Sequence, residues 1–196
     1  MQRILTFILT MLVAAGAGAA SLADVTVPDT AEVAGAKLVL NGVGLRTKFF
    51  LKIYVGGLYL QQKTSSADAV QADAGPDRIL MHMIYAVSHD QFSDAWLEGF
   101  KDNNSDNFDA LHDRVMQFIA YFSDSKQDDV ITLDYIPGTG THVSWNGTFK
   151  GNIPGEDFHK ALLRVFVGPN PPTEDLRDGM LGKVAMVSSG GNEIRG

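Results

Sequence analysis

Hydrophobic residues along this chain follow two spacings, one typical of strands and one typical of helices. Alternating apolar residues, and short apolar runs bounded by Gly, Asn or Pro, predict strands. These strands span residues 37–43, 49–60, 78–87 and 130–136. Asn146-Gly147 predicts a type I′ hairpin turn between strands 141–145 and 148–150, because both residues tolerate a positive φ.

Apolar residues three and four positions apart predict the helices. These span residues 88–100, 108–122, 157–167 and 173–181, with a shorter one inside 64–75. Ser88 and Gln91 have the spacing of a capping box at the start of the first long helix. The chain shows no strand–helix–strand alternation. This order predicts one α+β domain, with a large antiparallel sheet and helices on one of its faces.

The first 23 residues have the features of a signal peptide. Arg3 supplies a positive start, residues 4–13 an apolar core, and residues 15–23 a run of small residues, so we predict cleavage after Ala23. The alternative is an uncleaved membrane anchor, but the apolar run is short for a helix that crosses a bilayer. The expected divisions are a signal peptide, a domain and a flexible tail, at residues 1–23, 24–183 and 184–196.

Charge and cysteine content narrow the classes of function. The formal net charge is −7 at pH 7, so the chain has no general attraction for nucleic acid or for an anionic membrane. The chain has no cysteine, which excludes disulfides, thiolate metal sites, cysteine nucleophiles and lipoprotein attachment. We expect a periplasmic or secreted protein that relies on its hydrophobic core, has no nucleic-acid partner and, after cleavage, is not stably inserted in a membrane.

Motifs for metal binding and for nucleophilic catalysis are weak. The five histidines show no pairing three or four residues apart that would suit a metal site. Residues 102–113 have oxygen-bearing side chains at the spacing of a calcium loop, but Asn107 replaces its glycine and Asp113 its glutamate. We interpret this segment as a solvated loop between helices, and we expect no metal and no cofactor. The sequence contains no GxSxG motif and no phosphate-binding loop.

A single arginine, Arg46, lies in the apolar run LNGVGLRTKFFLKIYVGGLYLQ, residues 40–61. Along an uninterrupted strand, Arg46, Tyr54 and Gly56 share one face, and Tyr59 lies on the other face, which has the pattern of a core. A guanidinium and a phenol over a bare glycine can hold a carboxylate or an enolate with an apolar body. The alternative is that Arg46 and the nearby lysines form the wet face of an edge strand.

Three segments of the chain resemble the chalcone isomerase-like family, especially its bacterial secreted branch. They are LNGVGLRTKFFLKIYVGGLYL, DVITLDYIPGTGTHVSWNGT and GNIPGEDFHKALLRVFVGPNPPTEDLRDGMLG, in this order. The resemblance covers residues 33–182. It implies an open-faced β-sandwich, in which a large antiparallel sheet carries a layer of helices and a ligand cleft lies between the two.

The members of this family differ in activity. Plant chalcone isomerases close a flavanone ring, other members bind fatty acids, and some have no established catalysis. In both ligand-using groups an arginine at the start of this strand meets the anionic oxygen of the ligand, and Arg46 matches it. Three positions depart from the enzymes, since Tyr54 replaces a threonine, Phe92 a tyrosine and Gly99 an asparagine. Lost polar contacts lower the rate, so the resemblance argues against chalcone cyclisation.

The favoured hypothesis is a ligand-binding protein. Arg46 binds the carboxylate of a small apolar ligand such as a fatty acid, and Tyr54 or Tyr59 adds a hydroxyl contact. Tyr54 is the better candidate, because alternation puts Tyr59 on the other face unless a bulge intervenes. The candidates for the apolar wall are Met81, Met83, Phe92, Trp96 and Phe100.

Two alternatives stay open on the sequence. The first is an isomerase or intramolecular lyase that acts on another enolisable substrate, with Arg46 stabilising the oxyanion. The second is a structural or interaction protein with a closed cleft. If Arg46 lies outside any pocket, the binding and enzyme hypotheses both weaken.

Overall fold

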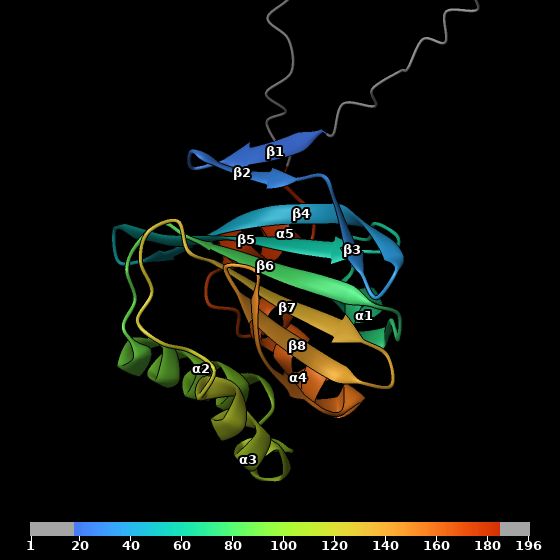
Figure 1. Ribbon diagram of the computed structural model, residues 1–196, viewed down its shortest axis with the longest axis vertical. Helices are drawn as coiled ribbons and strands as arrows, with labels where there is room; N and C mark the ends of the chain where they lie inside the picture. Colours follow the sequence, from blue (N-terminus) through green and yellow to red (C-terminus); the bar gives the residue numbers. More distant parts are fainter. Residues whose placement is uncertain (1–17, 185–196) are drawn as a thin grey trace, which may run out of the picture.

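The computed structural model describes residues 18–184 and shows one large antiparallel sheet with helices beside it (Figure 1). Seven strands pair in the order β3-β4-β5-β6-β7-β8-β9, and β1 and β2 form a separate hairpin. The strands are β1 (Ala19–Leu22), β2 (Val25–Pro28), β3 (Thr30–Val33), β4 (Ala36–Lys48), β5 (Leu51–Leu60), β6 (Asp77–Met83), β7 (Val130–Ile136), β8 (Gly140–Trp145) and β9 (Thr148–Ile153). Every neighbouring pair is antiparallel.

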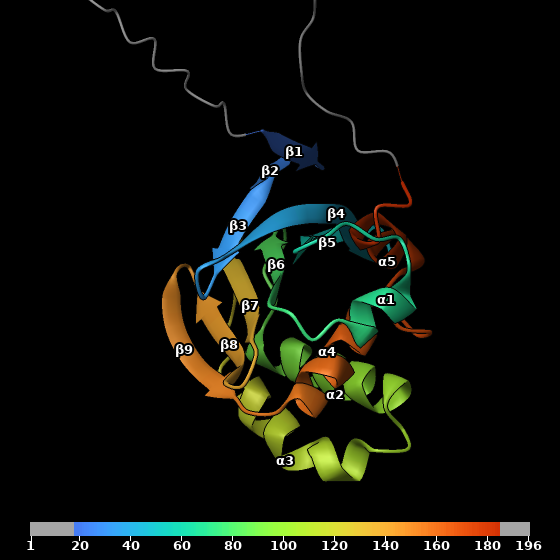
Figure 2. The same cartoon turned by 90° about the vertical axis from the view of Figure 1, so that its right-hand side faces the viewer.

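Five helices accompany the sheet. They are α1 (Ala67–Ala72), α2 (His89–Asn103), α3 (Phe108–Ile119), α4 (Glu156–Val167) and α5 (Glu174–Met180). The sheet curls, and the helices lie on its concave side, whereas the β1–β2 hairpin lies on the other side near β4 (Figure 2). The predicted α+β class and the open-faced β-sandwich are therefore confirmed.

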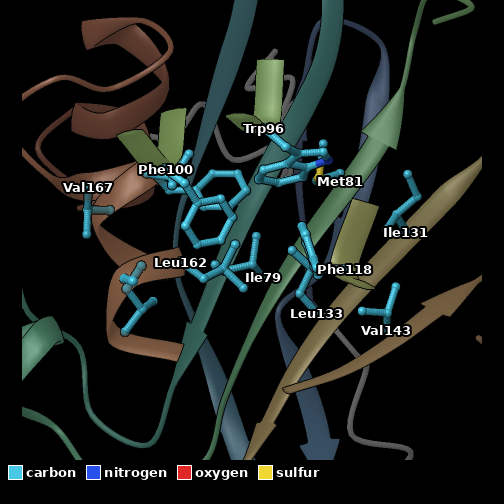
Figure 3. Close-up of a cluster of buried hydrophobic side chains, with 14 of the residues drawn as sticks. Ile79, Met81, Trp96, Phe100, Phe118, Ile131, Leu133, Val143, Leu162 and Val167 are labelled. Carbon is cyan, nitrogen blue, oxygen red and sulfur yellow. The ribbon is translucent and has the colours of Figure 1, made fainter. Parts of the chain in front are cut away.

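The main core fills the space between the curled sheet and the helices. Side chains from β6, β7 and β8 meet aromatic side chains from α2 and α3 and aliphatic ones from α4 (Figure 3). Trp96 packs edge-on against Phe118 at 4.9 Å and against Phe166 at 5.7 Å between ring centroids. Such contacts stabilise a core beyond the area that they bury, so α2 is fixed against both α3 and α4.

Glycines in β4 and β5 let α5 lie directly on the sheet. A Cβ at Gly44 would collide with backbone atoms of Leu176, and one at Gly56 would come within 2.8 Å of the Leu176 side chain. The prediction that a ligand lies over Gly56 is therefore wrong, because the side chains of Leu176 and Met180 of α5 occupy that space. This face of β4 and β5 is buried around Gly44 and Gly56, whereas Lys48 and Lys52 near the turn are exposed.

The second cluster lies on the outer side of β4 and β5, under the β1–β2 hairpin. Val27 of β2 is almost fully buried there, with Leu38, Val55 and Tyr59. Both faces of this part of the sheet are covered. Arg46 and Tyr59 therefore lie on opposite faces of the sheet, and each face is covered by its own hydrophobic cluster.

The predicted strands 37–43 and 49–60 need correction. β4 runs through Asn41-Gly42 to Lys48, and a tight turn at Phe49 and Phe50 leads into β5. The turn went unpredicted because Phe49 adopts a positive φ of 56°, which is rare for a bulky residue. Arg46 and Tyr54 are direct cross-strand partners, so they share a face for a reason other than alternation along one strand.

The predicted strand 78–87 is also too long. β6 ends at Met83, and residues 84–87 lead into α2, which starts with the predicted capping box of Ser88 and Gln91. The hairpin turn is confirmed, with φ of 50° at Asn146 and 74° at Gly147. Within residues 18–184, no helix has the length and hydropathy needed to cross a membrane.

Candidate ligand-binding site

A cavity of about 620 Å³ lies between the β4–β5 hairpin, the end of β6, α2 and the loop before α5. This volume is in the range of sites for small organic ligands. Its walls combine aliphatic, aromatic and methionine side chains with a few polar groups: Arg46, Lys48, Tyr54, Tyr85, Gln91, Glu98, Asp102 and Asn170. The charged ends of Glu98 and Asp102 are exposed on α2. The cavity is thus a mainly apolar space with cations on the hairpin side and carboxylates on the α2 side.

Arg46 lines this cavity and is held there by backbone carbonyls. Its Nη1 donates to Thr47 O at 2.9 Å and to Pro172 O. A guanidinium carries five N–H donors, and these two bonds use the two on Nη1. Among the described residues, no carboxylate forms an ion pair with Arg46. The edge formed by Nε and Nη2 is thus available for a ligand.

Tyr54 lies beside Arg46 on β5 and also lines the cavity. Burial raises the pKa of its phenol well above the ordinary value of 10.0, and the nearby positive charge of Arg46 offsets only part of that rise. The hydroxyl therefore stays neutral at physiological pH. A neutral phenol can donate a hydrogen bond to an anionic oxygen.

The apolar wall includes most of the aromatic and methionine residues that the sequence indicated. Phe92 and Trp96 of α2 and Met81 and Met83 of β6 line the cavity. Their positions follow from spacing, since a step of four residues puts Phe92 and Trp96 on one stripe of the helix. The Trp96 Nε1 is buried without a hydrogen-bond partner in the described part of the chain.

Two residues from the sequence hypothesis are not brought to the cavity. Tyr59 lies on the outer side of β5, and its hydroxyl donates to Pro28 O at 2.8 Å. Burial is the main cause that raises its pKa to about 12, so this phenol is a structural donor. Phe100 is fully buried against Phe118 and Phe158 and lies behind the wall. The bulge in β5 lies at Ile53, before Tyr54, and β5 pairs with β6 in unbroken register from Tyr54 to Tyr59, so nothing turns Tyr59 inward.

Sequence reasoning missed two parts of the site. The hairpin turn contributes Lys48, Phe49 and Leu51, and the loop between α4 and α5 contributes Asn170, Pro171 and Pro172. The pattern GPNPP signals the end of a helix, but nothing local shows that the loop after it reaches Arg46, 126 residues away in the chain.

Comparison with known proteins agrees with this architecture. A family model described as chalcone isomerase-like matches residues 19–182. The chain belongs to the chalcone isomerase-like family. Among curated protein sequences, no significant match is found.

One similar solved structure is that of a fatty-acid binding protein of Arabidopsis thaliana. The two structures superpose with a TM-score of 0.61 at 16% sequence identity, over 82% of this chain and 93% of the other. At this identity the likeness shows the fold. The chalcone isomerase-like fold expected from the sequence is therefore confirmed.

Phe92 and Gly99 line the cavity. The resemblance implies polar catalytic side chains at these two positions, and neither residue supplies one. Phe92 is buried in the wall, in aromatic contact with Phe122 and Trp145. At Gly99, a Cβ would come within 2.8 Å of Val165 Cγ1, so the side chain of Val165 fills the space that an asparagine would need. The cavity is thus built around apolar residues at both positions.

A second buried polar cluster lies at the other end of β6. His159 Nε2 and Asp77 Oδ2 are 2.6 Å apart, and the His159 ring stacks on Tyr135 at 4.0 Å between centroids. Burial raises the pKa of Asp77 above its ordinary value, and the attraction of His159 offsets only part of the rise. Within residues 18–184, no group of three or more His, Asp or Glu side chains is placed to hold a metal ion.

Proposed function

We propose that this protein binds a small apolar carboxylate, such as a fatty acid, after export to the periplasm or the cell exterior. The observation that carries the proposal is the position of Arg46 at a cavity whose lining is mostly apolar. Its Nη1 is anchored to two carbonyls, and its remaining N–H groups have no carboxylate partner among residues 18–184. Parallel N–H groups of a guanidinium match the two oxygens of a carboxylate.

Tyr54 supports the same ligand class. A neutral phenol beside Arg46 adds a donor without adding charge. The apolar wall of Phe92, Trp96, Met81 and Met83 suits a hydrocarbon chain, and methionine adapts to chains of different shape. The fatty-acid binding protein of Arabidopsis thaliana has this fold, which supports a similar ligand here.

Chalcone cyclisation is not part of the proposal. Phe92 and Gly99 bring no polar group to the cavity, and Val165 packs where a longer side chain would lie at Gly99. No histidine lines the cavity in the described part of the chain. The two carboxylates of the lining, Glu98 and Asp102, are exposed on α2 and form no ion pair with Arg46, so no observed contact favours a different isomerase or intramolecular lyase reaction.

The test is to compare an acid with its neutral ester. We expect the wild-type protein to bind dodecanoic acid about 10 to 100 times more tightly than methyl dodecanoate, because hydrogen bonds to charged groups contribute about 1.5–3 kcal/mol. Arg46→Gln should lose this preference and keep the affinity for the ester. Isothermal titration calorimetry gives all four dissociation constants.

Lys48→Gln is the matched control. Lys48 is another cation that lines the cavity, but its side chain is exposed at the hairpin turn. This variant should keep the preference for the acid. A preference that survives in Arg46→Gln, or a wild-type protein without affinity for either compound, would contradict the proposal.

A further inference from the structure

The turn between β4 and β5 exposes three consecutive large apolar side chains. We call residues 48–52 the hairpin tip. Phe49 is 89% exposed, Phe50 is 102% exposed and Leu51 is 46% exposed. Single exposed apolar residues are common, but a contiguous group usually marks an interaction site. The tip thus has the character of a contact surface.

The backbone at this turn adds to the cost of the arrangement. Phe49 has a φ of 56°, in the left-handed region that glycine or asparagine adopts more easily. The conformation costs about 1 kcal/mol or more for a residue with a Cβ. A phenylalanine at position 49 improves neither the stability nor the solubility of the protein. Contact of the Phe49 ring with another molecule would explain both its strained backbone and its exposure.

The two charged residues of the tip are both positive, whereas the exposed carboxylates of the cavity lining, Glu98 and Asp102, lie across the cavity on α2. Lys48 and Lys52 flank the apolar residues, both are exposed, and neither forms an ion pair with the described residues. The sequence has no Asp or Glu between Glu32 and Asp68. This local excess stands against a net charge of −7 for the whole chain. A negative partner surface is therefore attracted to this hairpin and not to the molecule in general.

We propose that the hairpin tip inserts into the surface of an anionic lipid bilayer. Aromatic and aliphatic side chains flanked by lysines suit the boundary between headgroups and acyl chains. Each lysine near an anionic membrane contributes about 1 kcal/mol of attraction. Tyr85, which is 49% exposed in the segment between β6 and α2, adds a side chain that favours the same boundary. This is contact with one leaflet, not insertion across the membrane.

A second copy of this chain fits the tip less well. A stable protein interface buries about 800 Å² on each partner, more than three side chains at one turn provide. A symmetric contact between two tips would also bring four lysines together, and like charges repel. The bilayer needs no matching shape, so it is the partner that this small basic and apolar tip favours.

The tip also forms the mouth of the cavity. Lys48, Phe49, Leu51 and Tyr85 line it, whereas Phe50 does not. If the cavity binds a fatty acid, as proposed above, a ligand can pass between bilayer and cavity without crossing water. The attachment itself does not depend on that function, and Phe50 allows the two to be tested separately.

The first test measures partition onto vesicles of phosphatidylcholine and phosphatidylglycerol in equal parts by flotation. Wild-type protein should bind these vesicles, bind less at high salt, and bind less to pure phosphatidylcholine. Phe50→Ser should weaken the partition about tenfold and Lys52→Gln about fivefold. The matched controls are Phe149→Ser and Lys150→Gln, which change an exposed Phe and Lys on β9 and should have no effect.

The second test reports on the tip alone. Phe50→Trp fluorescence should be quenched by brominated phosphatidylcholine in the same vesicles, beyond the background from the two native tryptophans, and Phe149→Trp fluorescence should not. Absence of quenching at Phe50→Trp, or equal quenching at both positions, would overturn the proposal. So would a wild-type dimer in sedimentation that Phe50→Ser disperses, because the partner would then be a second copy.

Fatty-acid binding is measured on the same variants in solution. Phe50→Ser should keep the wild-type dissociation constant for dodecanoic acid, since Phe50 is outside the cavity lining. Vesicle binding without fatty-acid binding would refute the proposed function and leave the membrane contact standing. The reverse result would refute the membrane contact alone.

Discussion

Arg46 is a charged side chain that contacts to the backbone hold at the cavity. The bonds from Nη1 to Thr47 O and Pro172 O set the plane of the guanidinium. A salt bridge would have neutralised the group and blocked its edge, and none forms with residues 18–184. The positive charge of Arg46 at the cavity is therefore not neutralised by an ion pair with these residues.

Asp77 and His159 provide a different case, in which burial opposes charge. The pair is almost fully inside the core, and Asp77 Oδ1 and His159 Nδ1 lack partners within the described residues. A carboxyl group whose pKa is raised by folding stabilises the protein most below its unfolded-state pKa, and this contribution is lost as the pH rises through the raised pKa.

We therefore predict a pH-dependent difference between the wild type and Asp77→Asn. The unfolding free energy of the wild type should fall relative to that of the variant as the pH rises from about 4 to about 7. Carboxylates with a lowered pKa, such as Asp157, contribute equally to the unfolding free energies of both proteins, so their contributions cancel in the difference. Urea denaturation across this range measures the difference. Parallel pH profiles would show that Asp77 titrates as it does in the unfolded chain.

The contact between α5 and β4 connects packing to the site. α5 lies on Gly42 and Gly44 so closely that a methyl group at either position would meet its backbone. Pro172, which accepts from Arg46, lies just before Thr173, the N-cap of α5. The position of this short helix thus sets the position of the carbonyl that holds Arg46.

Gly44→Ala should accordingly be strongly destabilising. We expect a loss of about 3 kcal/mol in unfolding free energy, since the added methyl meets backbone that cannot move aside without displacing α5. Fatty-acid affinity should fall with it. Gly57→Ala is the control in the same strand pair, where the nearest atom, Tyr59 Cε2, is at an ordinary 3.4 Å. Similar losses in both variants would contradict this account.

The β1–β2 hairpin bears on the predicted cleavage after Ala23. β1 falls within the segment assigned to the signal peptide, yet its residues pair with β2, and Ala20 is buried. The predicted leader residues 1–17 lie outside the described residues, as does the tail from residue 185. Cleavage after Ala23 would remove β1, whereas Ala15-Gly16-Ala17 offers an alternative small-residue site that keeps it.

We predict that the exported protein retains residues 19–22. The physical reason is that β1 covers the outer cluster around β2 and Leu38, and apolar surface exposed by its loss would cost stability. Intact-mass spectrometry of the protein from the periplasm or medium identifies the first residue. A chain that begins at Asp24 would show that β1 is dispensable and that the original boundary is right.

The sequence predicted the elements with strong local signals. Strand 130–136 and the Asn146-Gly147 turn were found because alternation and turn chemistry agree there. β1, β2 and β3 were missed, since strands of four residues carry too little pattern. The turn at Phe49 was missed because its residues contradict turn chemistry.

The site was predictable only in part, for the same reason. Arg46, Tyr54, Phe92 and Trp96 were identified from one strand, one helix stripe and a family resemblance, and the structure brings them to one cavity. The contribution of Pro172 depends on how α5 packs on glycines far away in the chain. Such contacts arise from tertiary structure and leave no local trace in the sequence.

The fixed guanidinium has a consequence for selectivity. If the cavity binds a fatty acid as proposed, Arg46 is already oriented when the ligand arrives, and the carboxylate head and the hydrocarbon chain then contribute separately to affinity. The head contributes a constant amount, whatever the length of the chain behind it. Each added methylene then contributes about 0.8 kcal/mol until the cavity is full and nothing further beyond that point. The chain length at which affinity stops rising would thus measure the depth of the cavity, which the methionines of β6 and the aromatic residues of α2 determine.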